Sequence, residues 1–175
     1  FVVHCLPSGD IILKDGDILA LDIGVKYKNL FTDAAITIGI GKITDEQNKL
    51  ISVTKRALEL AINEARPGNH IGDIGNAIEN YVESKGLSLI KGLVGHGVGY
   101  AVHEEPNVPN YGKRSEGSVL KSGMILAIEP MVALGNGEVR KSKNGLSYET
   151  TDGSFSAHFE HTIAVTDNGC FVLTK

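Results

Sequence analysis

Two histidines and four carboxylates have the types and placement that a metal-dependent catalytic site requires. His96 and His103 lie in a glycine-rich segment, residues 95–111, which reads GHGVGYAVHEEPNVPNY. On a straight strand their spacing of seven residues places the two side chains on opposite faces. Either the chain bends between them or the two histidines have different functions. We expect different jobs, with His96 binding a metal ion and His103 facing a substrate.

Two histidines alone are weak support for a site, because histidine also serves many structural purposes. The carboxylates strengthen the case, since each lies in the middle of a predicted apolar strand, where an isolated buried charge is costly. One such residue is as well explained by a strand with a solvated face. Four of them together with His96 favour a shared site, and they are Asp22, Asp33, Glu129 and Glu160.

Four carboxylates and one imidazole form a donor set that suits two metal ions. Oxygen donors with one nitrogen favour Mn, Fe, Co or Zn over a thiolate-bound metal. Carboxylates that bridge can hold two ions about 3.5–4 Å apart. Cys5 and Cys170 lie outside this pattern, so we expect packed rather than ligating cysteines. The glycine run lacks the strand-to-helix context of a dinucleotide-binding loop.

Alternating apolar residues predict two strands that position the first two carboxylates. They cover residues 18–25 and 30–38, separated by a turn at residues 27–29. Successive strands joined by a short turn pair antiparallel. Asp22 and Asp33 then share one face, where like charges repel. The pattern therefore requires a cation between them, or a proton on one of them.

The remaining pattern alternates helices with further strands. Thr44 and Gln47 form a capping box that begins a helix ending near Arg66. A second amphipathic helix is predicted for residues 71–85, and we expect both helices to cover one face of the sheet. Further strands are predicted at residues 1–7, 124–130, 139–151 (around an Asn144–Gly145 turn), 157–165 and 170–173.

The length and composition suit one domain, residues 1–175. The formal net charge is −4 and no Lys/Arg run occurs, which argues against a nucleic-acid or anionic-membrane partner. No apolar run approaches the roughly 18 residues of a membrane span. Two cysteines without a paired framework fit a reducing compartment, so we expect a cytoplasmic monomer. The chain begins on an apolar run without Met, which we expect of a piece of a longer domain or of a product of processing.

The ordered set of carboxylates and histidine resembles the metal ligands of the type I methionine aminopeptidases. Segment 95–111 resembles the signature of that family, including His103 followed by Glu-Glu-Pro. His4, eighteen residues before Asp22, matches an upstream histidine, although Cys5 stands where the family has glycine. The resemblance implies the α+β pita-bread fold, an antiparallel sheet with pseudo-twofold halves and helices on one face. It also implies that an N-terminal segment of the family is absent here.

The resemblance implies a ligand set and an activity. Asp22 would bind one of two divalent ions with both oxygens, Asp33 and Glu160 would bridge the ions, and His96 with Glu129 would complete the second site. A metal-bound hydroxide would attack the first peptide bond of a peptide or nascent protein and release its N-terminal methionine.

The resemblance also implies roles around the metal ions. Glu129 would shuttle protons, His103 would hydrogen-bond the carbonyl oxygen as charge builds there, and His4 would position the scissile amide. The other histidines receive no role in this scheme. We expect His158 and His161 to be hydrogen-bonded residues of a strand.

Two alternatives remain open. A proline-specific aminopeptidase of the same fold would use the same five ligands, but it usually differs after the second histidine, where this chain has Glu104-Glu105-Pro106. A metal-free relative acting as a binding platform would have lost ligands, whereas all five are present here.

Overall fold

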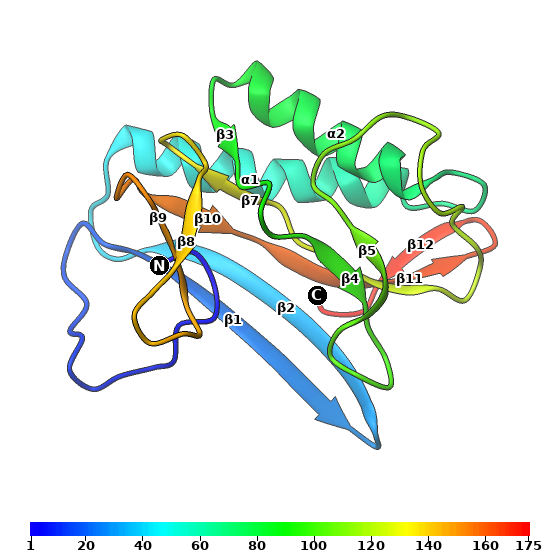
Figure 1. Cartoon of the computed structure of the whole chain (residues 1–175), viewed down its shortest axis with the longest axis horizontal. Helices are drawn as coiled ribbons and strands as arrows, with labels where there is room; N and C mark the ends of the chain where they lie inside the picture. Colours follow the sequence, from blue (N-terminus) through cyan, green and yellow to red (C-terminus); the bar gives the residue numbers. More distant parts are fainter.

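A central antiparallel sheet lies beneath two helices in the computed structural model, which describes residues 1–175 (Figure 1). Its main path has the order β1-β2-β11-β6-β4-β5, and β12 pairs with the second half of β11. These strands are β1 (Ile18–Tyr27), β2 (Leu30–Gly39), β11 (Glu160–Thr166), β6 (Ile125–Ile128), β4 (Gly95–Gly97), β5 (Glu104–Val108) and β12 (Gly169–Val172).

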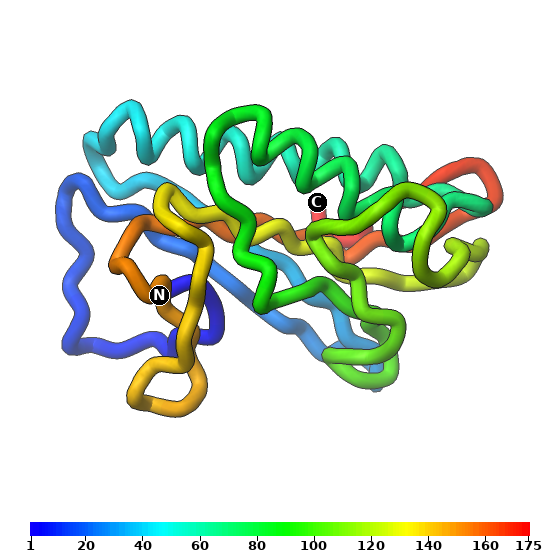
Figure 2. Tube along the Cα trace, turned by 45° about the horizontal axis from the view of Figure 1, so that its top comes forward, coloured from blue at the N-terminus to red at the C-terminus, as the bar shows by residue number.

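Two small sheets flank the central one. The first has the order β10-β7-β3, with β10 (Ser156–His158), β7 (Met131–Ala133) and β3 (Ser88–Leu89). The second is the hairpin of β8 (Val139–Lys141) and β9 (Tyr148–Thr150). The first residues of the chain run beside this hairpin (Figure 2), where the backbone N–H of Val2 donates to the carbonyl of Tyr148 at 2.7 Å.

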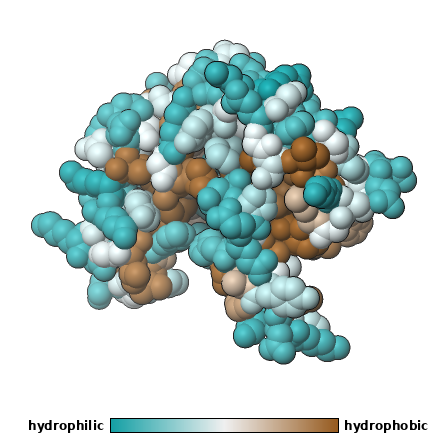
Figure 3. Space-filling view, turned by 45° about the vertical axis from the view of Figure 1, so that its right-hand side comes forward, coloured by the Kyte–Doolittle hydropathy of each residue, from teal (hydrophilic) through white to brown (hydrophobic).

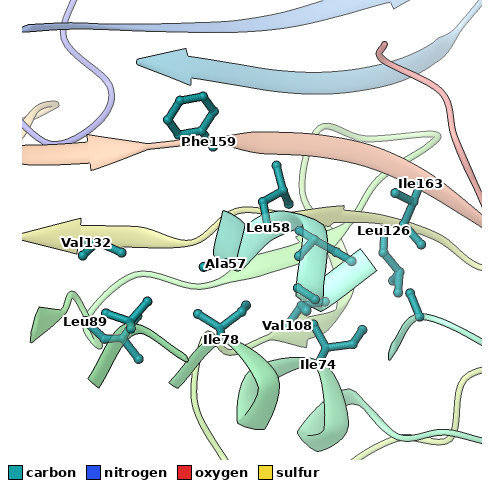
Figure 4. Close-up of a cluster of buried hydrophobic side chains, with 14 of the residues drawn as sticks. Ala57, Leu58, Ile74, Ile78, Leu89, Val108, Leu126, Val132, Phe159 and Ile163 are labelled. Atoms are coloured by element: carbon teal, nitrogen blue, oxygen red, sulfur yellow. The ribbon is translucent and has the colours of Figure 1, made fainter. Parts of the chain in front are cut away.

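The helices α1 (Asp45–Glu64) and α2 (Ile71–Ser84) pack against the sheet through their apolar faces. The predicted capping box is present at the start of α1, where Thr44 and Gln47 each accept a hydrogen bond from the other's backbone N–H. Side chains from both helices meet strand residues in one buried core (Figure 4). The core includes Ala57, Leu58, Ile74, Ile78, Val108, Leu126 and Ile163. Neither helix is long and apolar enough to cross a membrane.

The predicted hairpin at the start of the chain is confirmed as β1–β2. Lys28 and Asn29 form its two-residue turn, and both have positive φ, 46° and 66°. Such turns match the right-handed twist of the paired strands. Asp22 lies opposite Ala35, and Asp33 lies opposite Gly24, so the two carboxylates are diagonal neighbours.

Two predicted strands are each divided between sheets. The strand expected at residues 124–130 ends at Ile128, and the chain resumes after Pro130 as β7 in the small sheet. Proline has no N–H for the ladder, which explains this break. The strand expected at 157–165 divides at Phe159 into β10 and β11. The strand expected at residues 1–7 is reduced to one bridge between Val3 and Tyr148.

The two helices cover only part of the sheet. The face of the β1–β2 hairpin that lies opposite its carboxylates is solvent-exposed and aliphatic, with Ile23 62% exposed. Its other exposed members are Leu21, Val25, Ile36 and Ile38. Figure 3 shows apolar patches, in brown, among the hydrophilic residues of one face of the molecule. The α+β class and the pita-bread fold with helices on one face of the sheet are confirmed, and on that face the helices leave the β1–β2 hairpin uncovered.

Candidate metal centre

The structure brings all five predicted ligands together, with His103 beside them. Three groups of side chains each have ligand atoms within 4.8 Å of one another. Their members are Asp22, Asp33 and Glu160; then His96, Glu129 and Glu160; and then Asp33, His96 and His103. Glu160 belongs to the first two groups, so one carboxylate connects the aspartate pair to the histidine side of the cluster.

The order of strands in the sheet explains why residues so far apart in sequence converge. Asp22, Asp33 and Glu160 lie on the adjacent strands β1, β2 and β11. Glu129 directly follows β6, the next strand, and His96 lies at the centre of β4. The ligands therefore come from five consecutive strands across the sheet, and both strand breaks described above lie next to a glutamate of the cluster.

The glycines around His96 allow β4 to fit between its neighbours. A Cβ on Gly95 would collide with the carbonyl oxygen of Ala127, and a Cβ on Gly97 would collide with that of Glu105. Only glycine permits such close backbone approach. The glycine-rich segment thus seats His96 within the sheet.

The cluster is buried on one side and open on the other. Glu160 is 2% exposed, His96 5% and Asp33 8%, whereas Asp22 and His103 are solvent-exposed. A ligand can therefore reach the cluster from the side of the exposed pair. The buried side provides the low-dielectric surroundings in which charge–charge interactions are strong.

The hydrogen bonding of His96 leaves a space that suits a cation. Its Nδ1 lies 2.9 Å from the carbonyl oxygen of Gly97, which can only accept, so we assign the proton to Nδ1. The lone pair of Nε2 then faces Oε1 of Glu129 at 3.4 Å. Two acceptors facing each other repel unless a cation lies between them. Two donors that each lie about 2.1 Å from one tetrahedral ion are themselves roughly 3.4 Å apart.

The carboxylates of the cluster lack any compensating lysine or arginine. Burial, with Glu129, Asp33 and Asp22 adding like charge, raises the pKa of Glu160 to about 10. Burial and then the charge of Asp22 also raise the pKa of Asp33. Crowded carboxylates of this kind are stabilised in their charged form by a divalent cation. The donor set therefore fits divalent ions.

Two buried polar residues that support the cluster were not singled out from the sequence. Thr162 Oγ1 accepts from the N–H of Asp33 and donates to its carbonyl, both at 2.8 Å, which fastens β2 to β11. Asn110 donates through Nδ2 to the carbonyl oxygen of Glu129 at 3.0 Å. The only sequence feature that pointed to Thr162 is that it shares a strand face with Glu160. No sequence feature pointed to Asn110.

Of the two histidines expected to act on substrate, His103 lies at the open side of the cluster. The His103 ring lies 4.3 Å from that of His96, centroid to centroid. Burial and then the neighbouring His96 lower the pKa of His103, with His4 among the smaller contributions, so His103 is neutral at pH 7. His4 is exposed, has a positive φ of 59° and belongs to none of the three ligand groups.

Comparison with known proteins places this cluster in a family. Residues 2–167 match the sequence profile described as "Metallopeptidase family M24", and this span contains the whole cluster together with His4. The chain belongs to metallopeptidase family M24. Divalent metal use follows from that membership, in agreement with the oxygen-rich donor set.

Relatives of this M24 chain include named methionine aminopeptidases. It is 44% identical over 174 residues to methionine aminopeptidase 1 of Bacillus subtilis (strain 168), covering 99% of this chain and 70% of that protein. The crystal structure of methionine aminopeptidase from Thermotoga maritima superposes with a TM-score of 0.98 at 46% identity, covering 99% of this chain and 70% of the other.

A second group of similar solved structures is more distant. The crystal structure of the prolidase from Pyrococcus horikoshii gives a TM-score of 0.74 at 27% identity, covering 98% of this chain and 45% of that one. The shared pita-bread fold is thus confirmed for both groups. The greater similarity lies with the methionine aminopeptidases, so the proline-specific alternative is less well supported.

Proposed function

We propose that this M24 chain is a metal-dependent aminopeptidase that removes the N-terminal methionine from proteins and peptides. The observation that carries the proposal is the five-ligand cluster within a fold that superposes on a methionine aminopeptidase with a TM-score of 0.98. All five ligands are retained, which argues against a metal-free binding platform. Residues 1–175 would act as one catalytic domain.

The proposed metal content is two divalent ions, drawn from Co, Mn, Fe and Zn. Asp22 would serve one ion, and His96 with Glu129 would serve the other. Glu160 would bridge them, which its membership of both ligand groups supports. Asp33 would do the same, supported by its grouping with Asp22 and also with His96.

In the proposed mechanism, side chains at the open edge of the cluster bind and orient the substrate. Bound divalent ions lower the pKa of water and so supply a nucleophile at neutral pH. The Glu129 carboxylate accepts a proton and delivers it to the leaving amine. His103, neutral at pH 7, donates a hydrogen bond to the carbonyl oxygen as negative charge grows there. His4 positions the scissile amide.

We expect metal to be both bound and required. The apo protein reloaded with Mn or Co should hold up to two ions per chain, because the cluster offers five ligands. Peptidase activity on a peptide that begins with Met should disappear with a chelator and return when the metal is restored. Elemental analysis and a peptide-cleavage assay measure these two quantities. A reloaded protein that retains no metal after desalting contradicts the proposal.

Replacing His103 with alanine should lower turnover by about 10²-fold while metal content stays near normal. The loss corresponds to one donor to the developing oxyanion, which is typically worth 10²–10³ in rate. Tyr100→Ala is a matched control in the same loop, because Tyr100 is 85% exposed and should affect neither quantity. His103 also lies within ligand distance of Asp33 and His96. Loss of metal from His103→Ala would therefore identify it as a ligand instead.

A further inference from the structure

His158 is a buried histidine directed at the metal centre, outside the five-ligand set. It is 2% exposed and lies at the end of β10, where it pairs with Met131 of β7. Thr37 of β2 holds its backbone on both sides, since the Thr37 hydroxyl donates to the His158 carbonyl at 2.8 Å and accepts from its N–H at 2.9 Å. This clamp leaves little freedom in the direction of the side chain.

The ring of His158 has no hydrogen-bond partner. Both ring nitrogens are buried and unpaired, so the expectation of a hydrogen-bonded strand residue is wrong for His158. That expectation holds for His161, whose Nδ1 lies 3.0 Å from Thr174 Oγ1. Nearly all buried polar side-chain atoms in proteins are paired, and each exception calls for an explanation.

The polar group that faces the His158 ring is the carboxylate of Glu129. Nε2 of His158 lies 3.3 Å from Oε2 of Glu129, while the other oxygen, Oε1, lies 3.4 Å from Nε2 of His96. The carboxylate of Glu129 is thus held between two imidazoles, with one oxygen facing each. The distance between Nε2 and Oε2 is within hydrogen-bond range, but the ring orientation makes no hydrogen bond there.

We propose that His158 is a positioning residue that donates a hydrogen bond to Oε2 of Glu129 in the metal-loaded protein. Only Oε1 then remains for the ion that His96 and Glu129 would share, so His158 fixes Glu129 as a one-oxygen ligand. The inference rests on the proposed function, because it takes these residues to be ligands. Partners that orient metal ligands in this way typically change metal affinity by 10–100-fold.

The test compares two replacements of equal length at position 158. His158→Gln keeps a side-chain N–H donor, whereas His158→Met has a similar shape without one. Calorimetric titration of each apo protein with Mn measures the affinity at every binding step. We expect the Met variant to bind one of two ions 10–100-fold more weakly and the other ion normally. The Gln variant should stay within about threefold of the wild type.

Controls separate positioning from folding. His161→Leu, on β11, the next strand along the chain, should leave both affinities unchanged, and circular dichroism of the apo proteins checks the fold. If the Met variant does not fold, His158→Ala replaces it in the comparison. In a Glu129→Ala background the same replacement should have no further effect on metal affinity, because His158 is proposed to act only through Glu129.

Each other result overturns a definite statement. Equal affinities in the wild type and the Met variant overturn the positioning role. Equal losses in the Gln and Met variants also overturn it, because they would assign the effect to the ring as ligand or packing group. A wild-type protein that binds no Mn overturns the proposed function and this inference together. A wild-type protein that binds Mn while the Met variant binds it equally well overturns this inference alone.

Discussion

Replacing Glu129 with glutamine should lower turnover by about 10²–10⁴-fold, the range over which general acid–base groups contribute. Gln has nearly the same shape, so packing is preserved. It has no negative charge for the ion shared with His96, and its amide cannot accept and return a proton at neutral pH. The two losses act on the same step, so we expect an effect at least as large as that of the His103 replacement.

The measurement is kcat for a peptide beginning with Met. Mn is kept at saturation, so that weakened metal binding is not mistaken for a slower chemical step. Metal content is determined in parallel. Glu83→Gln is the control, because Glu83 is an exposed carboxylate of α2 whose only ion pair, with Lys91, is long at 3.9 Å. A fully loaded Glu129 variant that retains more than a tenth of wild-type turnover would exclude the proposed proton shuttle.

Much of the centre could be predicted because its carboxylates occur within strands that are otherwise apolar. Asp22 and Asp33 interrupt strands that otherwise alternate as expected, and the short turn fixes their register. A charged side chain that lowers the stability of a buried strand is a strong sign of function. The capping box of α1 was predictable for a similar reason, since helix ends are determined by a few adjacent residues.

Other parts could not be predicted because they depend on contacts between distant segments. Apolar residues run almost without interruption up to Pro130, and alternation continues through Phe159. Pro130 indicates a break in the strand, but the local pattern does not show that the chain changes sheets at both places. Thr162 supports Asp33 from 129 residues away in sequence. Likewise, the position of His158 beside Glu129 follows from the pairing of β10 with β7, which is a property of the assembled fold.

The metal-free protein should lose stability as the pH rises, and Glu160 is the main reason. The pKa of Glu160 is raised to about 10 by burial and by neighbouring carboxylates, whereas an unfolded glutamate titrates near 4.3. The folded chain therefore holds more protons than the unfolded chain between these values. The free energy of unfolding is highest below the lower value and falls through this window, by up to about 1.4 kcal/mol per pH unit. Asp33, whose pKa is also raised, adds in the same direction.

Replacing Glu160 with glutamine should therefore have opposite effects on the two forms of the protein. Without metal at pH 8, the variant should melt at a higher temperature than the wild type, because no buried carboxylate has to ionise. With saturating Mn the order should reverse, since ligands that bind only the folded state stabilise it and the variant lacks the carboxylate shared by two ligand groups. Melting curves at pH 5, 6.5 and 8, with and without Mn, measure both effects.

A matched control separates the buried carboxylate from net charge. Glu138→Gln removes the same charge from an exposed position, so any general relief of the net charge of −4 appears in it equally. Only Glu160→Gln should melt above the wild type without metal and below the wild type with Mn. An apo wild-type protein that becomes more stable from pH 5 to pH 8 would show that Glu160 ionises without cost in the folded chain. The acidic cluster would then not need a cation to be stable, and the electrostatic argument for the metal centre would fail while the geometric one remained.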